Sequence, residues 1–188
     1  KVGCFVVDNE DELFALDRIA GDMGVKQNIL LRVTPGIDPH THKKISTGSV
    51  ESKFGIAIET GQAIETVEKA LSLKNIKLLG FHCHVGSQIF ESEPFTTASE
   101  IMLDFISEVR DSLGFTAEML NLGGGLGVRY TEDDPEIDYG EKIKEVAEIL
   151  NSQCEKLGLP VPKILMEPGR SLVADAGMTL YTVGSVKE

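Results

Sequence analysis

Short apolar runs alternate with helical segments along the whole chain, and this alternation constrains the fold more than any other feature. Four segments carry apolar residues at helical spacing, around residues 13–20, 64–71, 98–109 and 143–154. Before, between and after them lie five β-branched runs predicted to be buried strands: Val2–Val7, Asn28–Val33, Ile76–His84, Ala117–Leu122 and Lys163–Glu167. Parallel strands joined by helical crossovers give this pattern, so the sequence predicts an α/β layer or barrel. Glycines are expected to cap three of the helices at their C-terminal ends: Gly21, Gly114 and Gly158.

Length and composition fit one folded domain and exclude several classes of partner. The 188 residues are 41% hydrophobic and 26% charged, which predicts a packed core rather than a disordered chain. A net charge of -12 argues against binding to nucleic acid or to an anionic membrane surface. No apolar run approaches the roughly 20 residues that span a bilayer, and no targeting signal follows Lys1. Three widely spaced cysteines fit no disulfide framework, so we expect a reducing, cytoplasmic location.

Two long connections, residues 34–59 and 123–139, follow the C-terminal ends of predicted strands, where α/β proteins place their ligand sites. The second begins with Gly123, Gly124 and Gly125, which match neither a dinucleotide fingerprint nor a P-loop. Consecutive glycines allow backbone N–H groups to approach an anion closely. A tight turn needs fewer glycines, so the pattern favours a site for the phosphate of a small cofactor.

Histidines occur in two pairs with one residue between them. His82 and His84 end a predicted strand and project to one face, with His84 at the mouth of the fold and His82 one layer deeper. A buried histidine is usually a satisfied core residue, which is the interpretation favoured for His82. A metal-dependent hydrolase using His82 and His84 stays open as an alternative, although no further ligand is identifiable. His40 and His42 lie in a polar loop, where solvated side chains are the simpler account.

Opposite charges end the last predicted strand of the barrel type. Glu167 and Arg170 flank Pro168 and Gly169, after an apolar run. A charge on a buried strand needs a partner, so Glu167 and Arg170 could form a structural pair. They could equally face a ligand at the mouth of the fold, and local sequence does not decide between the two.

Several long motifs, in the right order and on successive strand ends, resemble those of pyridoxal-phosphate decarboxylases built on an alanine-racemase-like barrel. The general motifs are His84–Gln88, Gly123–Gly125 and Glu167–Arg170. Within that group the chain is similar to the diaminopimelate decarboxylases, through four further segments: Thr34–His42, Ile45–Gly48, Ser52–Ile56 and Glu167–Gly177. The resemblance covers nearly the whole chain. It implies a TIM-type (β/α)8 barrel that binds pyridoxal 5'-phosphate.

The resemblance also implies a role for each matching residue. His84 would stack on the cofactor ring, and Glu167 would pair with the pyridine nitrogen and keep it protonated. The phosphate would be bound by Ser87, by the backbone of Gly123, Gly124 and Gly125, and by the backbone around Gly169 and Arg170. Arg170 would also hold a carboxylate of the substrate, meso-2,6-diaminopimelate. Arg32 is expected near the cofactor, and relatives of this kind form homodimers with shared active sites.

Parts of the family pattern are missing from the sequence. The Schiff-base lysine belongs to a Tyr-Ala-x-Lys motif that does not occur here, and the motif lysines present, Lys43, Lys44 and Lys53, occupy a connecting loop. We therefore expect a fragment without catalytic residues of its own: residues 1–177 form the later part of the barrel. Residues 178–188 begin a C-terminal β-domain, with a strand over Met178–Val186. A third possibility is a non-catalytic phosphate-binding α/β module.

Overall fold

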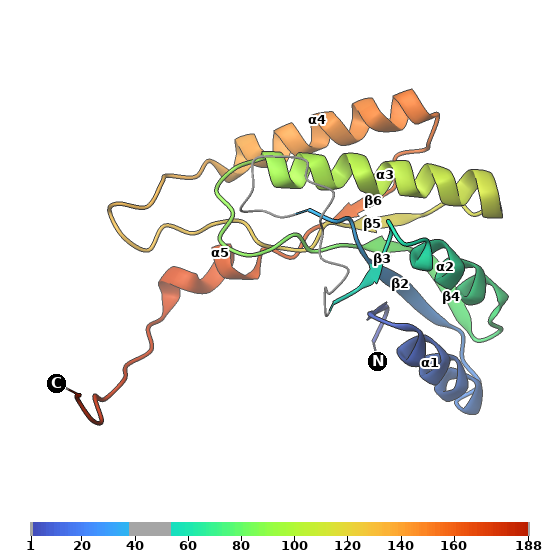
Figure 1. The fold of residues 1–188 in the computed structure, drawn as a ribbon, viewed down its shortest axis with the longest axis horizontal. Coiled ribbons are helices and arrows are strands. Elements are labelled where there is room, and N and C mark those ends of the chain that lie inside the picture. Colours follow the sequence, from blue (N-terminus) through green and yellow to red (C-terminus); the bar gives the residue numbers. More distant parts are fainter. Residues whose placement is uncertain (1, 38–53, 188) are drawn as a thin grey trace.

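The computed structural model describes residues 2–37 and 54–187, and strands and helices alternate along them (Figure 1). The strands are β1 (Phe5–Val7), β2 (Gln27–Thr34), β3 (Ile56–Ala57), β4 (Ile76–His82), β5 (Met119–Asn121) and β6 (Lys163–Leu165). The helices are α1 (Glu10–Asp22), α2 (Gln62–Ser72), α3 (Glu93–Leu113), α4 (Tyr139–Leu157), α5 (Gly169–Val173) and the 3-10 turn η1 (Ala174–Ala176). Each of the five predicted strands and four predicted helices is confirmed.

All strand pairs in the described residues are parallel, and the strands lie in the order β1-β2-β4-β5-β6. Each strand therefore pairs with the next one along the main sheet, without the reversal of strand order that defines a doubly wound sheet. The four long helices follow the strands around one side of the sheet (Figure 1). A singly wound parallel sheet with its helices on one side is the arrangement of a TIM-type barrel. The short strand β3 pairs with β2 outside this path.

The core lies between the sheet and the helices. Its largest fully buried side chains include Phe81, Leu31 and Leu120 from the sheet and Phe95 and Met102 from α3. Phe81 packs edge-on against Phe105, with ring centroids 5.1 Å apart, an arrangement that aromatic rings favour. This packing fixes α3 against the centre of the sheet and so sets the position of the loops that follow β4 and β5.

Capping residues explain where α1 and α4 begin and where α3 and α4 end. The side chains of Asn9 and Asp138 accept hydrogen bonds from the backbone N–H groups of Glu12 and Glu141 and so start α1 and α4. Gly114 and Gly158 end α3 and α4 in the left-handed conformation, as predicted.

The prediction that Gly21 caps α1 is wrong. Gly21 lies inside the helix, and the left-handed residue that follows is Gly24, with φ of +63°. A Cβ at Gly21 would lie 2.7 Å from Nδ2 of Asn75. Gly21 therefore serves close packing rather than helix termination.

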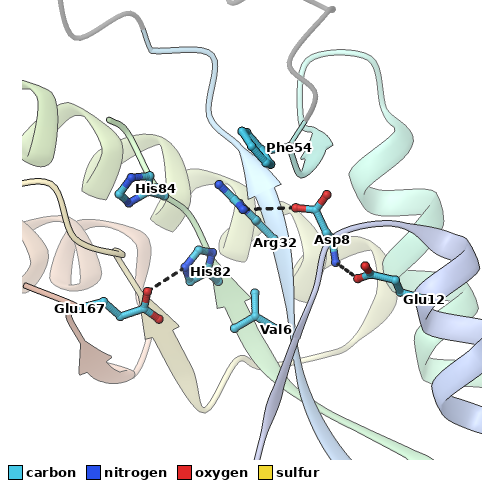
Figure 2. Close-up of a pocket in the computed structure, with 8 residues that line it drawn as sticks. All are labelled: Val6, Asp8, Glu12, Arg32, Phe54, His82, His84 and Glu167. Atoms are coloured by element: carbon cyan, nitrogen blue, oxygen red, sulfur yellow. Dashed lines mark hydrogen bonds and ion pairs between the residues drawn. The ribbon is translucent and has the colours of Figure 1, made fainter. Parts of the chain in front are cut away.

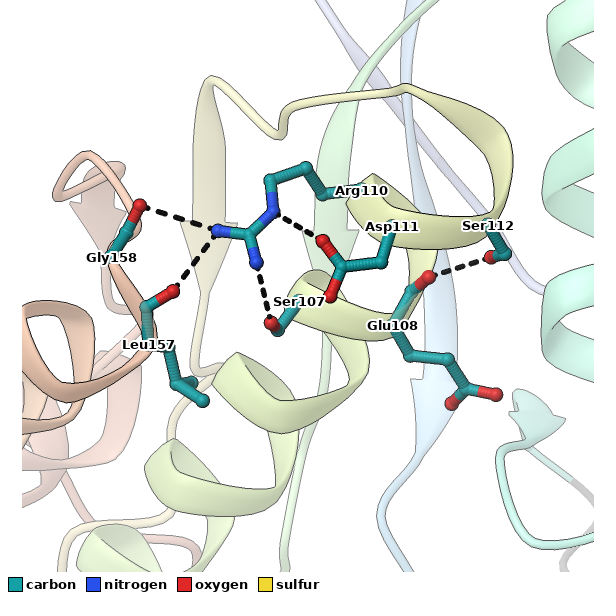
Figure 3. Close-up of polar contacts among 7 residues, drawn as sticks. All are labelled: Ser107, Glu108, Arg110, Asp111, Ser112, Leu157 and Gly158. Carbon is teal, nitrogen blue, oxygen red and sulfur yellow. Dashed lines mark hydrogen bonds and ion pairs between the residues drawn. The ribbon is translucent and has the colours of Figure 1, made fainter.

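Arg110 joins the C-terminal ends of the two helices that pack side by side, α3 and α4 (Figure 3). Its Nη1 donates to the carbonyl oxygens of Leu157 and Gly158 over 3.1 and 3.2 Å, and its Nη2 donates to Oγ of Ser107. The last carbonyls of a helix have no partners within the helix and carry its negative dipole end, so a guanidinium is a suitable partner.

The segment Met178–Val186 differs from its prediction, because residues 177–187 form no strand or helix. Its large apolar side chains are exposed, Tyr181 by 89% and Met178 by 87%. A strand is stabilised by its partner in a sheet, and this segment has none among the described residues. The alternating pattern alone was therefore insufficient to form a strand here. The proposed boundary near residue 177 coincides with the end of η1 and remains a prediction.

Candidate functional site

An open cavity of about 610 Å³ lies at the C-terminal ends of the strands (Figure 2). Its lining comes from β1, β2, β4 and α1, from the residues that follow β1, β4 and β6, and from the segment just before β3: Val6, Asp8, Glu12, Arg32, Phe54, His82, His84 and Glu167. Strand register explains part of this gathering, because Arg32 aligns with His82 and His82 with Asn121 across neighbouring parallel strands. Aligned residues of a parallel sheet project to the same face, so these polar side chains form one row.

Glu167 is held on both of its carboxylate oxygens. Nδ2 of Asn121 donates to Oε1 over 2.8 Å, and Nε2 of His82 lies 3.7 Å from Oε2. The rest of the carboxylate is open to the cavity, since the Glu167 side chain is 53% exposed to solvent. The structural Glu167–Arg170 pair considered from the sequence is wrong, because Arg170 makes its contacts elsewhere. Glu167 thus presents an oriented negative charge to a ligand.

His82 and His84 both favour the neutral form. Burial lowers the pKa of His82, and the charge of Arg32 lowers it further, while Glu167 opposes the shift. Partial burial and then Arg32 lower the pKa of His84. The Gly124 N–H donates to Nδ1 of His84 over 3.3 Å, which places the imidazole proton on Nε2. His84 therefore offers a neutral, oriented ring at the cavity.

The glycine run lies where the loops after β4, β5 and β6 meet. A Cβ at Gly124 would overlap the carbonyl oxygen of Glu167, and one at Gly125 would overlap that of Gly86. Gly123, with φ of +70°, has the Cys83 carbonyl oxygen 2.6 Å from the position of a Cβ. Only glycine fits such close approaches, so the run holds these three loops together.

The amides of this run are not equivalent. The Gly123 N–H donates to Oδ1 of Asn121 over 2.9 Å, and the Gly124 N–H is taken by His84. In the described part of the chain, the Gly125 N–H has no such acceptor. Of the three amides predicted to bind a phosphate, that of Gly125, beside Gly86 and Ser87, is therefore the one without an acceptor among the described residues. The phosphate role itself stays a prediction. Gly169 is engaged as well, since its N–H donates to the Glu167 carbonyl oxygen over 2.8 Å.

Arg170 connects the loop after β6 with the loop after β4. Its Nη2 donates to Oγ of Ser87 over 3.1 Å, and its Nη1 donates to the hydroxyl oxygen of Tyr130 over 3.0 Å. All three side chains are exposed and project from loops or from the first turn of α5. A guanidinium beside a hydroxyl and the Gly125 amide is an arrangement that suits a phosphate group.

Arg32 lies between His82 and Asp8 in the cavity lining (Figure 2). Oδ1 of Asp8 lies 3.4 Å from its Nη1, and its guanidinium carbon lies 4.8 Å from the centroid of the Phe54 ring. Asp8 also accepts from the Gly55 N–H over 3.0 Å. This arrangement places Arg32 in the cavity lining, while its position near a cofactor stays a prediction. Its fixed charge contributes to the lowered pKa of both histidines.

The structure thus brings together the residues singled out from the sequence, and it adds others. His84, Glu167 and the glycine run meet at the C-terminal ends of the strands, with Ser87 and Arg170 joined at the next loop. Asn121, Asp8 and Phe54 were missed. A buried asparagine between two leucines on an apolar strand was the available signal for Asn121, because buried polar groups need partners.

Some predictions lie outside the described residues, namely those on His40, His42, Lys43, Lys44 and Lys53. Across residues 2–37 and 54–187, no group of three or more His, Cys, Asp or Glu side chains is placed to hold a metal ion. Among the helices of the same ranges, none is long and apolar enough to cross a membrane.

Curated proteins similar to the whole chain include several diaminopimelate decarboxylases. The enzyme of Bacillus subtilis is 46% identical over 188 residues, which are 100% of this chain and 43% of that protein. The enzyme of Halalkalibacterium halodurans is 48% identical over 187 residues and is likewise covered to 43%. The chain therefore spans less than half the length of these relatives.

Solved structures and a family comparison agree with this similarity. The diaminopimelate decarboxylase of M. jannaschii superposes with a TM-score of 0.82 at 34% identity, over 91% of this chain and 39% of that one. The Helicobacter pylori enzyme, complexed with L-lysine, superposes with a TM-score of 0.72 at 33% identity, over 90% of this chain and 40% of that one. The family described as pyridoxal-dependent decarboxylase, pyridoxal binding domain, matches residues 1–174. With the parallel barrel-type sheet and the site at its strand ends, this match shows that the chain belongs to the pyridoxal-dependent decarboxylases.

Proposed function

We propose that this chain supplies the cofactor-binding part of a decarboxylase that converts meso-2,6-diaminopimelate to L-lysine with pyridoxal 5'-phosphate. The observation that carries the proposal is the oriented carboxylate of Glu167, held by Asn121 and His82 and open to the cavity. Bound pyridoxal phosphate supplies an electron-accepting ring, which takes up the electron pair left when carbon dioxide departs.

The residues present fit this cofactor. Glu167 offers a carboxylate for the ring nitrogen, and the neutral His84 offers a flat surface for the ring. Arg170, Ser87 and the Gly125 amide offer donors for the phosphate. The glycine run lets the loops that carry these two groups of residues pack closely against one another.

The residues of the site have distinct tasks in this proposal. Glu167 holds a proton on the ring nitrogen, which makes the ring a better electron acceptor. Arg170 and Ser87 hold the phosphate, and the charge of Arg170 also suits a substrate carboxylate. The substrate assignment is supported by the similarity to diaminopimelate decarboxylases over the whole chain.

The two alternative functions, a metal-dependent hydrolase and a non-catalytic phosphate-binding module, have less support from the arrangement of the site. A hydrolase metal would need a third ligand beside His82 and His84, whereas His82 faces Glu167 and His84 accepts from Gly124. A non-catalytic phosphate-binding module does not account for the orientation of Glu167. Membership of the decarboxylase family supports the proposed function over both.

Binding of pyridoxine 5'-phosphate to the chain tests the proposal. This ligand has the ring and the phosphate but no aldehyde, so it needs no lysine. We expect binding, measured by the ring's absorbance, and a ring nitrogen that stays protonated to higher pH than in free solution. Glu167→Gln should weaken binding about tenfold or more, because a charge-assisted hydrogen bond is lost.

Glu118→Gln is the matched control, because Glu118 is a similarly exposed carboxylate that pairs with Lys77 outside the cavity. It should leave affinity and ring protonation unchanged. A Glu167→Gln variant that binds as the original chain does would contradict the proposal.

The homodimer implied by the resemblance belongs to the same proposal, and sedimentation equilibrium would measure it.

A further inference from the structure

Asn121 is one of the polar residues of the site that sequence reasoning missed, and it is more deeply buried than most residues of the site. Its exposure is 4%, at the end of β5, between Leu120 and Leu122. Both halves of its carboxamide are used. Nδ2 donates to Oε1 of Glu167 over 2.8 Å, and Oδ1 accepts from the Gly123 N–H over 2.9 Å.

These two bonds connect different parts of the proposed cofactor site. Glu167 follows β6 and faces the ring nitrogen in the proposal above, whereas Gly123 begins the loop that leads to the Gly125 amide. The backbone adds a third link, because the Glu167 N–H donates to the Gly123 carbonyl oxygen over 2.7 Å. Glu167 and the glycine run are therefore held as one unit by a single buried side chain and one backbone bond.

Geometry limits which way the Glu167 carboxylate can turn. The carboxylate is half exposed, so water could solvate it in many rotamers. With Asn121 on Oε1 and His82 beside Oε2, one orientation is selected before any ligand arrives. A pre-oriented charge binds its partner without losing further rotamer freedom, which is the advantage of a preorganised site.

We propose that Asn121 is a positioning residue, which orients the carboxylate of Glu167 toward the ring nitrogen of the cofactor and couples it to the phosphate loop. This inference rests on the proposed function and adds a residue to it. Asn121 itself touches neither ligand group. Its effect is exerted through Glu167 and Gly123.

The chain contains a matched control for Asn121. Gln153, on α4, is also a buried carboxamide, with an exposure of 8%, and its Nε2 donates to Oδ1 of Asp104 over 2.6 Å. This pair lies between α3 and α4, away from the cavity. Replacing either carboxamide by leucine removes one amide-to-carboxylate bond from a buried position. Both variants should therefore lose stability, whereas only Asn121→Leu should alter the site.

The first measurement concerns the full chain without ligand. Nuclear magnetic resonance should show slow hydrogen exchange of the Asn121 carboxamide, with the Gln153 carboxamide as an internal reference. Glu167→Ala should speed the exchange of Asn121 alone. Equal exchange rates of the Asn121 carboxamide in the original chain and in Glu167→Ala would show that Asn121 is not bound to Glu167, and would overturn the inference.

The second measurement is the binding of pyridoxine 5'-phosphate. Asn121→Leu should weaken binding about tenfold or more and move ring-nitrogen deprotonation toward its pH in free solution. Asn121→Asp keeps an oxygen for the Gly123 N–H but replaces the donor to Glu167 by a second carboxyl group. Repulsion between the two carboxylates should turn Glu167 away from its orientation, so binding should weaken in this variant too. The other charged or titratable groups that line the cavity, Asp8, Glu12, Arg32, His82 and His84, are unchanged in all variants.

The outcomes separate two failures. If Asn121→Leu and Asn121→Asp keep the original affinity and ring protonation while losing stability as Gln153→Leu does, Asn121 is structural and the inference is overturned. If the Asn121 carboxamide is protected from hydrogen exchange but the unmodified chain does not bind pyridoxine 5'-phosphate, the proposed function fails. The role of Asn121 in cofactor binding then fails with it.

Discussion

Nη2 of Arg170 donates a hydrogen bond to Oγ of Ser87 over 3.1 Å, joining residues that lie 83 positions apart in the sequence. The contact directs the guanidinium toward the loop after β4 and away from Glu167, which is only three residues before it. It separates the site into a negative part at Glu167 and a positive part at Arg170, a division that suits a cofactor with a cationic ring and an anionic phosphate.

Arg170→Ala should weaken the binding of pyridoxine 5'-phosphate about 10- to 100-fold, because a charge-assisted contact with the phosphate is lost. Calorimetric titration with pyridoxine 5'-phosphate and with pyridoxine, which has no phosphate, gives the measurement. Affinity for pyridoxine should not change. Arg18→Ala, at an exposed arginine on α1, is the control. An equal loss of affinity for both ligands would place Arg170 away from the phosphate.

Gly124→Ala should destabilise the chain and impair ligand binding together. The new Cβ would overlap the carbonyl oxygen of Glu167, so the loops after β5 and β6 must separate, at a cost of about 1–3 kcal/mol for overpacking. Thermal unfolding and pyridoxine 5'-phosphate binding measure the two effects. Gly3→Ala has open space around its Cβ and should change neither. Wild-type stability in Gly124→Ala would show that the loops are not packed as described.

Stability should fall as the pH drops through the range where free histidine titrates. The folded chain lowers the pKa of His82 and His84 from the ordinary value of 6.5, chiefly by burial. The unfolded chain therefore takes up protons first, and lowering the pH from about 7.5 to about 5.5 favours unfolding. Urea unfolding across this range measures the effect, and His82→Gln should make the dependence shallower. A dependence that is unchanged in His82→Gln would contradict the lowered pKa of that residue.

Arg110→Met should lower the melting temperature, because the last carbonyls of α4 lose their guanidinium partner (Figure 3). Arg110→Lys should restore only part of the melting temperature. The lysine ammonium group keeps the positive charge, but it lacks the planar donor fork with which arginine reaches all of these acceptors. Arg18→Met removes an exposed ion pair within one helix and serves as the comparison. Equal melting temperatures for the variants at positions 18 and 110 would show that the contact contributes nothing.

This chain should not form a Schiff base with pyridoxal phosphate at its site. None of the described residues that line the cavity is a lysine, and the motif lysines of the sequence lie outside the described residues. Borohydride reduction followed by peptide mapping measures this directly. Stoichiometric labelling of one lysine, together with formation of L-lysine from meso-diaminopimelate, would refute the expectation of an inactive chain.

The sequence by itself determined the order of the elements and most of the site. Buried parallel strands are continuous apolar runs and helices carry apolar residues every three or four positions, so both patterns are local. His84, the glycine run, Glu167 and Arg170 stand out for a related reason: polar or flexible residues at the end of an apolar strand need an explanation in the fold or in a ligand. Local patterns also misled, at Gly21 and over Met178–Val186, where packing and the absence of a strand partner among the described residues decided the structure.

Only the tertiary structure decided which of these residues touch. Glu167 could have paired with Arg170, three positions away, but it takes Asn121, 46 positions away, because β5 and β6 are neighbours in the sheet and bring their ends together. Arg170 reaches Ser87 instead. Which glycine amide lacks an acceptor also depends on where the side chains of Asn121 and His84 lie. Such contacts arise from strand order and register, and these are properties of the assembled sheet rather than of any one segment.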